Sequence, residues 1–277
     1  MANKNASEQS YTLYVYYTRY SSWGVRAQLI FEYFQIPYKP QYFNYTIPAL
    51  TPPPELKVLP VLDVTPAPGS TSTTSTAGGE ETLRIHDSLA IAEYLADQHP
   101  DKHLWPADPQ LRALARVAAA QMHSGFAALR DAYPCNFVAR FTGPGVPFTE
   151  AIAADVCKLF ELWDRLRVAT KKRLAQLGET DAGFLCGGFS IADAFFWPVL
   201  WRLRSYDVPL TGISEEARKW MATMWNDPVM KAQAKEYFRQ AADQQSCMLP
   251  YDNVFKASAD VTSGTFTEDW VFDETSV

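Results

Sequence analysis

The chain has 277 residues, which is enough for one or two domains with a buried core. Its 47% of hydrophobic and 20% of charged residues are typical of a globular protein, and a net charge of −6 without a long basic run argues against nucleic-acid binding. No stretch approaches the roughly 18 uninterrupted apolar residues of a membrane helix, and the polar N-terminus lacks the apolar core of a signal peptide, so no membrane partner is expected.

The first hundred residues alternate between predicted strands and helices. Strands are predicted at residues 11–18, 40–45, 58–64 and 82–86, and helices at 22–35 and from Ser88 until Pro100 ends the pattern. This order, β-α-β followed by β-β-α, predicts an α/β domain with a mixed sheet. Serine, threonine and glycine dominate residues 65–81, which predicts a flexible insertion in a hairpin.

The second half of the chain has helical periodicity in every substantial segment. Helices are predicted at residues 109–131, 148–177, 190–204, 214–225 and 227–242. The segment 190–204 is almost entirely apolar, so it should be the most buried of these helices. The tail from about residue 249 is acidic and aromatic but aperiodic, and its pattern leaves open whether it wraps the surface or is disordered.

The cysteine pattern points to a reducing compartment. Cys135, Cys157, Cys186 and Cys247 are widely spaced, which is neither a disulfide framework nor a paired metal motif. We therefore expect a cytoplasmic protein without a metal site.

Three local signals concern chemistry, and the first is the strand-to-helix turn RYSSW at residues 19–23. A serine at a helix N-terminus ordinarily caps the helix by accepting a backbone N–H hydrogen bond. The same hydroxyl can instead donate to a thiolate, an anion that the helix dipole also favours. Taken alone, the turn favours the capping role.

The second signal is Leu59-Pro60 at the start of a predicted buried strand. Proline has no N–H for the strand ladder, so its position needs an explanation. A cis bond would provide one and would expose the backbone of Leu59 to a ligand, whereas an edge strand or a bulge explains the proline equally well.

The third signal is His86-Asp87-Ser88 at the next strand-to-helix turn. The N–H groups of a helix N-terminus can bind a carboxylate. Ser88 adds a hydroxyl and Asp87 can accept from an ammonium group, so the turn suits an amino-acid head group. Taken alone, it is again more typical of a helix cap.

These signals occur in the order that a known superfamily has them. The run IHDSLAIAEYL resembles the HQSLAIIEYL-type segment of glutathione transferases, especially the zeta class, which includes maleylacetoacetate isomerase. LYVYYTRYSSWGVR aligns without gaps with the first strand and turn of that class, and VLPVL matches the valine-proline strand. GFLCGGFSIADAFFWPV resembles the helical-domain signature, with Ser190 and Asp193 as its capping box. The segment from Leu104 to Arg130 resembles bacterial-type transferases with a YSSWS turn.

The resemblance implies the glutathione transferase fold. Residues 1–100 would form an α/β thioredoxin-like domain that binds glutathione, and residues 107–248 an all-α domain that binds the second substrate. The loop at 65–81 and the C-terminal extension at 249–277 would be additions to that fold. The resemblance also implies a homodimer.

The resemblance places the glutathione sulfur at the serine-containing turn. The zeta class has serines where this chain has Arg19 and Tyr20, and a cysteine where it has Ser21. The thiolate donor therefore stays open, with Ser21 first, Ser22 second and Tyr20 third. No cysteine lies near residues 19–23, which disfavours thiol–disulfide exchange.

The resemblance also assigns the other binding residues. Asp87 and Ser88 would hold the glutamyl end of glutathione, and Leu59 and Pro60 its cysteinyl backbone. The candidates for the second substrate's pocket all lie on the predicted helix 109–131, where they are also explained as core or surface residues: Met122, His123, Phe126 and Arg130.

The leading hypothesis is a glutathione transferase that adds the glutathione thiolate to a hydrophobic electrophile. One alternative is a glutathione-dependent cis/trans isomerase, which adds the thiolate reversibly to a conjugated alkene, in a biosynthetic pathway. The second alternative is a non-catalytic binding protein on the same fold. The sequence does not identify the electrophile.

Overall fold

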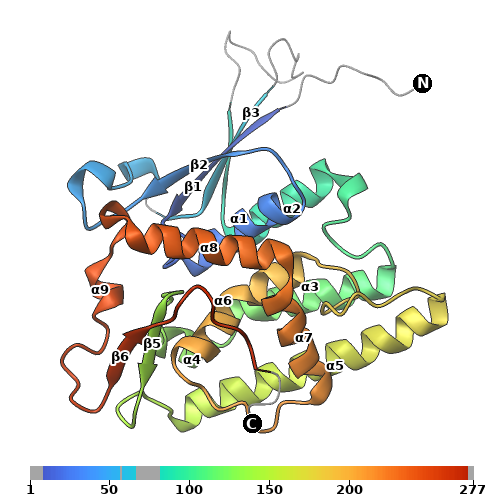
Figure 1. Cartoon of the computed structure of the whole chain (residues 1–277). Helices are drawn as coiled ribbons and strands as arrows, with labels where there is room; N and C mark the ends of the chain where they lie inside the picture. The colour runs from blue at the N-terminus through green and yellow to red at the C-terminus, as the bar shows by residue number, and fades with distance from the viewer. Residues whose placement is uncertain (1–8, 57, 67–81, 274–277) are drawn as a thin grey trace.

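The computed structural model describes residues 9–56, 58–66 and 82–273, so most of the predicted loop at 65–81 lies outside the described residues. A mixed sheet forms the centre of the first domain (Figure 1). Its strands are β1 (Ser10–Tyr16), β2 (Lys39–Phe43), β3 (Val61–Thr65) and β4 (Leu83–His86), in the order β2-β1-β3-β4. β1 pairs in parallel with β2 and antiparallel with β3, and β3 pairs antiparallel with β4. The predicted mixed sheet is thereby confirmed.

Two helices join this sheet to the second domain. α1 (Ser22–Tyr33) and α2 (Ser88–Gln98) begin at the two predicted strand-to-helix turns. Val25, Leu29 and Ile30 on α1 are fully buried, as their helical spacing predicts. α1 packs against α6 (Ile191–Ser205), and α2 packs against α3 (Pro109–Ser124). One hydrophobic core therefore runs through both domains.

The second domain is mainly helical. Besides α3 and α6, its helices are α4 (Ala127–Ala132), α5 (Glu150–Leu177), α7 (Glu215–Asn226), α8 (Pro228–Ala242) and α9 (Leu249–Asp252). Short 3-10 turns lie at Pro48–Leu50, Pro54–Leu56, Pro100–Lys102 and Gln244–Ser246. Within the described ranges, no helix is both long and apolar enough to span a bilayer.

The prediction of one helix over residues 109–131 is wrong, because the chain breaks at Gly125. The N–H of Gly125 donates to the carbonyl of Gln121 and ends α3, and Phe126 then takes a left-handed conformation with φ of 57°. A Cβ atom on residue 125 would lie 2.6 Å from that carbonyl oxygen, so glycine fits where a larger residue does not. The break turns α4 into a new direction and separates His123 from Arg130.

α6 is buried around its whole circumference, as its apolar sequence predicts. Asp193 in its first turn accepts hydrogen bonds from the backbone N–H groups of Leu185 and Ser190 and from the indole of Trp220, each at 2.9 Å. Three fixed donors satisfy this buried carboxylate, so Asp193 is a structural residue. This confirms its predicted place in the capping box.

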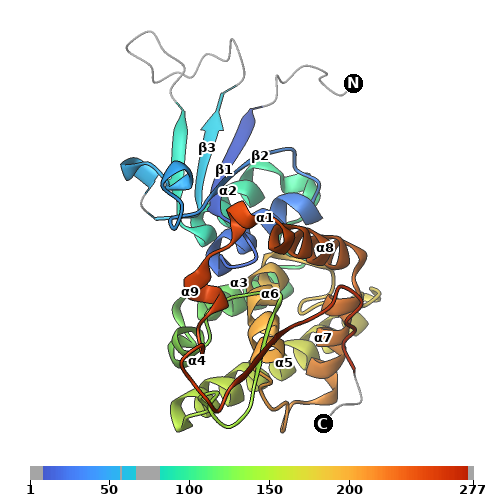
Figure 2. The same cartoon turned by 60° about the vertical axis from the view of Figure 1, so that its left-hand side comes forward.

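The C-terminal tail is ordered by pairing that its aperiodic sequence does not reveal. After α8 the chain passes the junction of the two domains at α9 and runs along the helical domain (Figures 1 and 2). There β6 (Thr262–Thr265) pairs antiparallel with β5 (Ala139–Thr142). The second domain therefore also contains a two-stranded sheet, which was not predicted.

Candidate functional site

The two serine-containing turns of the first domain open onto two adjoining cavities. The first cavity has a volume of about 190 Å³ and the second about 410 Å³, and both are lined by Trp23 and Leu59. Their combined size falls in the range of ligand pockets, which is roughly 300–1,000 Å³. Both domains contribute walls, so the site is a cleft between them.

The first cavity contains a buried hydroxyl that has no partner. Its lining residues are Trp23, Val58, Leu59, Pro60, Asp87, Ser88 and His123. Ser88 is 1% exposed, and its Oγ has no hydrogen-bond partner. The Nδ1 atom of His123 is also buried without a partner. An unpaired buried polar group is costly, so two of them on one small cavity indicate a polar ligand.

The two carboxylate oxygens of Asp87 have different partners. Its Oδ1 caps α2 by accepting from the N–H groups of Leu89 at 2.8 Å and Ala90 at 3.1 Å. Its Oδ2 lies 3.2 Å from Nε2 of His123 on α3, across the cleft. The capping role is therefore present, and the second oxygen remains on the cavity beside a residue of the other domain.

The peptide bond between Leu59 and Pro60 is cis. This was one of the two explanations that the sequence offered for a proline at the start of a buried strand. Both residues line the first cavity, just before β3 begins at Val61. Leu59 lies between the two cavities, since it lines the second one as well.

The second cavity has aromatic walls and contains the serines of the first turn. Its lining residues are Tyr16, Tyr20, Ser21, Ser22, Trp23, Tyr45, Leu59, Arg130, Pro134, Cys135, Arg202, Met248 and Tyr251. Ser21 is the N-cap of α1, and its Oγ accepts from the N–H of Gly24 at 3.2 Å. That bond uses an acceptor position of Ser21, so its O–H remains able to donate. Ser22 is the first residue of the helix and is half-buried on the same wall.

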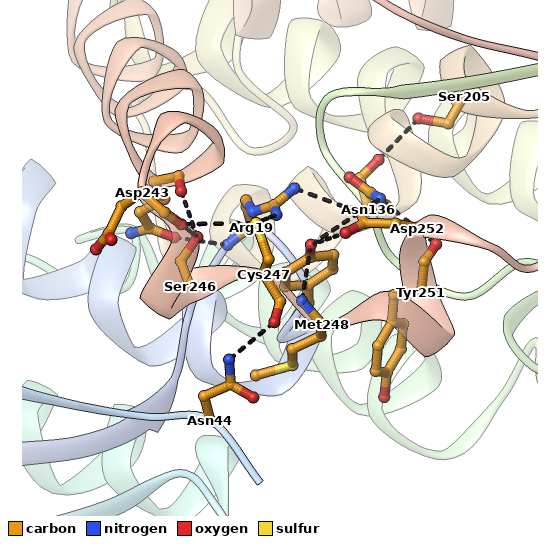
Figure 3. A network of polar contacts seen from close by, with 12 residues as sticks. Arg19, Asn44, Asn136, Ser205, Asp243, Ser246, Cys247, Met248, Tyr251 and Asp252 are labelled. Carbon is orange, nitrogen blue, oxygen red and sulfur yellow. Dashed lines mark hydrogen bonds and ion pairs between the residues drawn. The ribbon is translucent and has the colours of Figure 1, made fainter. Parts of the chain in front are cut away.

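Tyr20 is directed toward the C-terminal tail. Its hydroxyl donates to the carboxylate of Asp252, with both oxygens at 2.8 Å, and accepts from the N–H of Met248 at 3.2 Å (Figure 3). Arg19 lies in the same network, with Nη1 3.6 Å from Asp252. Burial raises the pKa of the Tyr20 hydroxyl. The third candidate for the thiolate donor therefore has its proton committed to Asp252.

Three arginines around the second cavity make no ion pair within the described residues. Arg130 and Arg202 line it, and Arg26 lies behind Trp23 with its guanidinium carbon 4.4 Å from the indole ring. They hold backbone carbonyls instead, as Arg202 does with Tyr133 at 2.8 Å. Burial, together with the charges of Arg202 and Arg130, lowers the pKa of Arg26 to about 9. Such crowded, unneutralised cations favour an anion in the cavity.

Trp23 connects the groups on both sides of the cleft. The ring of His123 meets its indole edge-on at 5.2 Å between centroids, and the guanidinium of Arg130 lies 5.3 Å from it. His123 and Arg130 therefore converge on one tryptophan from two separate helices. The sequence had predicted that both lie on one helix, at residues 109–131.

The other two predicted pocket residues lie outside both cavities. Met122 is completely buried in the shared core. Phe126 is half-buried and packs against the core at the break between α3 and α4.

Sequence reasoning missed several wall residues. Trp23 was visible in the turn motif but received no role, and Arg202 was hidden in an apolar helix. Met248 and Tyr251 come from the tail, where no periodicity marks them. An arginine within an otherwise apolar helix is a signal that could have identified Arg202, because a buried cation needs a specific partner.

This fold, with its two serine-containing turns and its cis proline on one cleft, resembles that of the glutathione transferases. Residues 109–223 match the family described as "Glutathione S-transferase, C-terminal domain". This match within the helical domain confirms the resemblance that was inferred from the sequence motifs.

Among known proteins, the chain is 32% identical over 125 residues to a probable maleylacetoacetate isomerase from Caenorhabditis elegans. The match covers 45% of this chain and 52% of that protein, so the chain spans about half the length of this relative.

Solved structures show the same fold at low identity. Glutathione transferase Omega 2C from Trametes versicolor has a TM-score of 0.55 at 20% identity, covering 85% of this chain and 99% of its own. A glutathione transferase homologue from Burkholderia, with bound glutathione, has a TM-score of 0.53 at 20% identity, covering 83% and 98%. Maleylacetoacetate isomerase from Anaeromyxobacter dehalogenans, with glutathione in its active site, has a TM-score of 0.53 at 16% identity, covering 82% and 95%. The predicted α/β plus helical fold class is thus confirmed.

Proposed function

We propose that the chain binds glutathione across the two cavities and adds its thiolate to an electrophilic carbon. The observation that carries this proposal is that the two cavities adjoin and share Trp23 and Leu59 as lining residues. An unpartnered hydroxyl, Ser88, lies in one, and a helix N-terminus with Ser21 and Ser22 lies in the other. A short peptide with a charged head and a thiol matches this arrangement.

The glutamyl end belongs in the first cavity. Its carboxylate would accept from the unpartnered hydroxyl of Ser88 at the start of α2, and its ammonium would donate to Oδ2 of Asp87, beside His123. Nδ1 of His123, also unpartnered, is a further polar contact from the second domain. The cysteinyl backbone would pass the backbone of Leu59, which lines both cavities.

The sulfur would lie at the start of α1. The helix dipole and a serine hydroxyl both stabilise the thiolate relative to the thiol, so the proton leaves to solvent at neutral pH. The sulfur lone pair then forms the C–S bond, and the displaced electron pair moves onto the conjugated system or the leaving group. Ser21 and Ser22 both line the cavity in which this carbon would be placed.

The second cavity further supports a particular kind of electrophile. Tyr16, Tyr45 and Tyr251 provide aromatic walls for an apolar body, in agreement with the hydrophobic substrate expected from the sequence. Arg130 and Arg202 add positive charge without an ion-pair partner among the described residues. We therefore propose a substrate with an apolar body and a carboxylate.

Glutathione-dependent isomerisation is the second candidate. A conjugated alkene that carries a carboxylate would suit the same walls, and the Caenorhabditis elegans relative is described as a probable maleylacetoacetate isomerase. Thiolate addition would convert the double bond to a rotatable single bond, and elimination would return glutathione unchanged.

The decisive experiment incubates the protein with glutathione and matched electrophiles, each as a carboxylate and as its methyl ester. We expect glutathione-dependent turnover that is faster for the carboxylate, and Arg130→Met should remove this preference. Consumption of glutathione and sulfur in the product indicate transfer, whereas an isomerised product without sulfur indicates isomerisation. Glutathione binding without any turnover would favour the non-catalytic binding protein, and no glutathione binding would reject the proposal.

We further propose that the protein is a homodimer and that it is located in the cytoplasm. The dimer rests on the resemblance to glutathione transferases, and the location is supported by four cysteines that are all free thiols. Light scattering at micromolar concentration should give twice the chain mass of 31.2 kDa, and a monomer mass would contradict the dimer.

A further inference from the structure

Cys135 lies on the wall of the second cavity, together with Ser21 and Ser22 of the first turn. The sequence disfavours thiol–disulfide exchange because it has no cysteine near residues 19–23. In the folded chain, however, the segment after α4 brings a thiol to the same cavity from the second domain. The addition reaction proposed above leaves this thiol without a role.

The backbone around Cys135 is fixed by α6. Carbonyl groups on both sides of the cysteine accept hydrogen bonds from side chains in the last turns of α6 and at its C-cap (Figure 3 shows the last of these): Arg202 donates to Tyr133 at 2.8 Å, Tyr206 to Pro134 at 2.7 Å and Ser205 to Asn136 at 3.2 Å. Cys135 is only 3% exposed, so a reagent reaches it through the second cavity.

The thiol shares its acceptor with a buried cation. Sγ of Cys135 lies 3.9 Å from the carbonyl oxygen of Pro198, and Nη1 of Arg202 donates to the same oxygen at 3.2 Å. Arg202 is 5% exposed, lines the second cavity and forms no ion pair with a carboxylate of the described residues. A buried cation without a counter-charge, next to a thiol on a cavity wall, points to an anionic ligand at that place.

Glutathione disulfide is an anionic ligand that suits this wall, since each of its halves carries carboxylates. One half would occupy the first cavity in the way proposed for glutathione, which places its sulfur at the start of α1. The other half would extend into the second cavity, where Arg130 and Arg202 can pair with its carboxylates. The disulfide bond would then lie in the cavity whose wall holds Cys135.

We propose that Cys135 is a glutathionylation site, which is modified by glutathione disulfide bound in the candidate active site; this inference rests on the proposed binding of glutathione. The sulfur of Cys135 attacks the sulfur of the half in the first cavity. A new S–S bond forms between them, and the original disulfide bond breaks. The other half leaves as glutathione, carrying the proton that Cys135 gives up.

The modification blocks the site that produces it. The mixed disulfide keeps a glutathionyl group in the cleft, so glutathione can no longer bind there. Free glutathione reverses the reaction by attacking the mixed disulfide, which restores the Cys135 thiol and releases glutathione disulfide. The fraction of blocked protein therefore follows the ratio of glutathione disulfide to glutathione.

The test treats the full chain with glutathione disulfide at neutral pH and maps the modified cysteines by mass spectrometry without reduction. The exposed Cys157 is an internal reference for the rate that access alone allows. We expect Cys135 to be modified at least about tenfold faster than Cys157, because binding holds the disulfide beside it. Saturating S-methylglutathione should remove this advantage and leave the rate at Cys157 unchanged.

Two variants serve as a matched pair. After treatment and removal of the disulfide, the wild type should no longer bind S-methylglutathione until dithiothreitol is added. Cys135→Ser should bind it throughout, whereas Cys157→Ser should behave like the wild type. Circular dichroism establishes that both variants are folded, and the mapping of the wild type is independent of either variant.

Calorimetry with S-methylglutathione separates this inference from the proposed function. If the untreated protein binds S-methylglutathione, the inference is wrong when Cys135 reacts no faster than Cys157, when S-methylglutathione does not protect it, or when the modified protein still binds S-methylglutathione. The proposed function is unaffected by those three results. If the untreated protein does not bind S-methylglutathione, the proposed function and this inference are both wrong.

Discussion

The hydroxyl of Tyr20 donates to the carboxylate of Asp252, across 232 residues of sequence, with both oxygens at 2.8 Å. Asp252 also accepts from the side chain of Asn136 at 2.9 Å and lies 3.6 Å from the guanidinium of Arg19. The turn that holds the candidate thiolate donors is therefore tied to the C-terminal tail. The same network brings Met248 and Tyr251 onto the second cavity (Figure 3).

Tyr20→Phe should loosen the tail and leave the thiol unaffected. The variant loses a buried hydrogen bond to a charged group, for which about 1–3 kcal/mol of unfolding free energy is expected. Urea unfolding measures that loss, and hydrogen exchange should show faster exchange at residues 248–252. Tyr45→Phe is the control, because Tyr45 lines the same cavity but is 44% exposed. Unchanged exchange in Tyr20→Phe would contradict the tie to the tail.

Ser21 or Ser22 should lower the pKa of bound glutathione. A free thiol has a pKa of roughly 8.5, and a helix N-terminus with a hydroxyl donor should lower it by about one to two units. Thiolate absorbance against pH should show a higher pKa in Ser21→Ala or Ser22→Ala, and the conjugation rate near neutral pH should fall in the same variant. Tyr20→Phe should titrate like the wild type.

The Ser21 variant needs a separate control for stability. Ser21 also caps α1, and losing a cap lowers the unfolding free energy by about 0.5–2 kcal/mol. Ser214→Ala removes an equivalent cap from α7, where Ser214 accepts from Ala217 at 3.1 Å, far from the site. It should lower stability and leave the thiol pKa unchanged. If Ser21→Ala and Ser22→Ala both titrate like the wild type, the helix terminus alone stabilises the thiolate.

Ser88→Ala should weaken glutathione binding about tenfold, the loss of one hydrogen bond to a charged group. Because Ser88 Oγ is unpartnered, its removal should not lower the stability of the free protein. Calorimetric titration measures the affinity, and Ser124→Ala, an exposed serine on α3, should bind normally. Wild-type affinity in Ser88→Ala would remove the glutamyl group from this cavity.

Asp108→Asn should lower the melting temperature at neutral pH and lower it much less at pH 2. Asp108 caps α3 and pairs with Arg173 at 2.6 Å, and the hydrogen bond from Arg173 lowers the pKa of Asp108 from 3.8 to about 2. A lowered pKa in the folded state contributes stability above the ordinary pKa and loses it as the pH falls through the folded value. The difference between wild type and variant should therefore shrink between pH 4 and pH 2.

Asparagine caps helices about as well as aspartate, so this substitution mainly tests the ion pair. Arg173→Gln should give the same loss, and the double variant should add little to either single one. Full additivity of the two substitutions, or a difference that stays constant with pH, would show that the pair contributes nothing.

Local sequence information predicted the first domain well. β1 to β4 and the starts of α1 and α2 follow from alternation, helical spacing and the capping serine and aspartate, all of which act within a few residues. The proline at position 60 drew attention to its own peptide bond, but its position left a cis bond and an edge strand or bulge equally open, and the structure shows the cis bond. The motifs also identified the superfamily and the position of both turns.

Local sequence patterns gave wrong predictions, or none, for features that depend on contacts between distant segments. The break at Gly125 is set by the carbonyl of Gln121 and by packing of Phe126, and it decides that His123 and Arg130 approach Trp23 from separate helices. The helical spacing of apolar residues continues across a single glycine, so the sequence pattern predicted one helix over residues 109–131.

The sequence by itself determined the order of elements, the two-domain fold and the residues of the two turns, because these depend on neighbours in the chain. Only the tertiary structure decided that Tyr20 binds Asp252, that Arg202 reaches the second cavity and that the tail pairs with β5. Those contacts join residues more than a hundred positions apart, and no periodic pattern encodes which distant partner a side chain will meet.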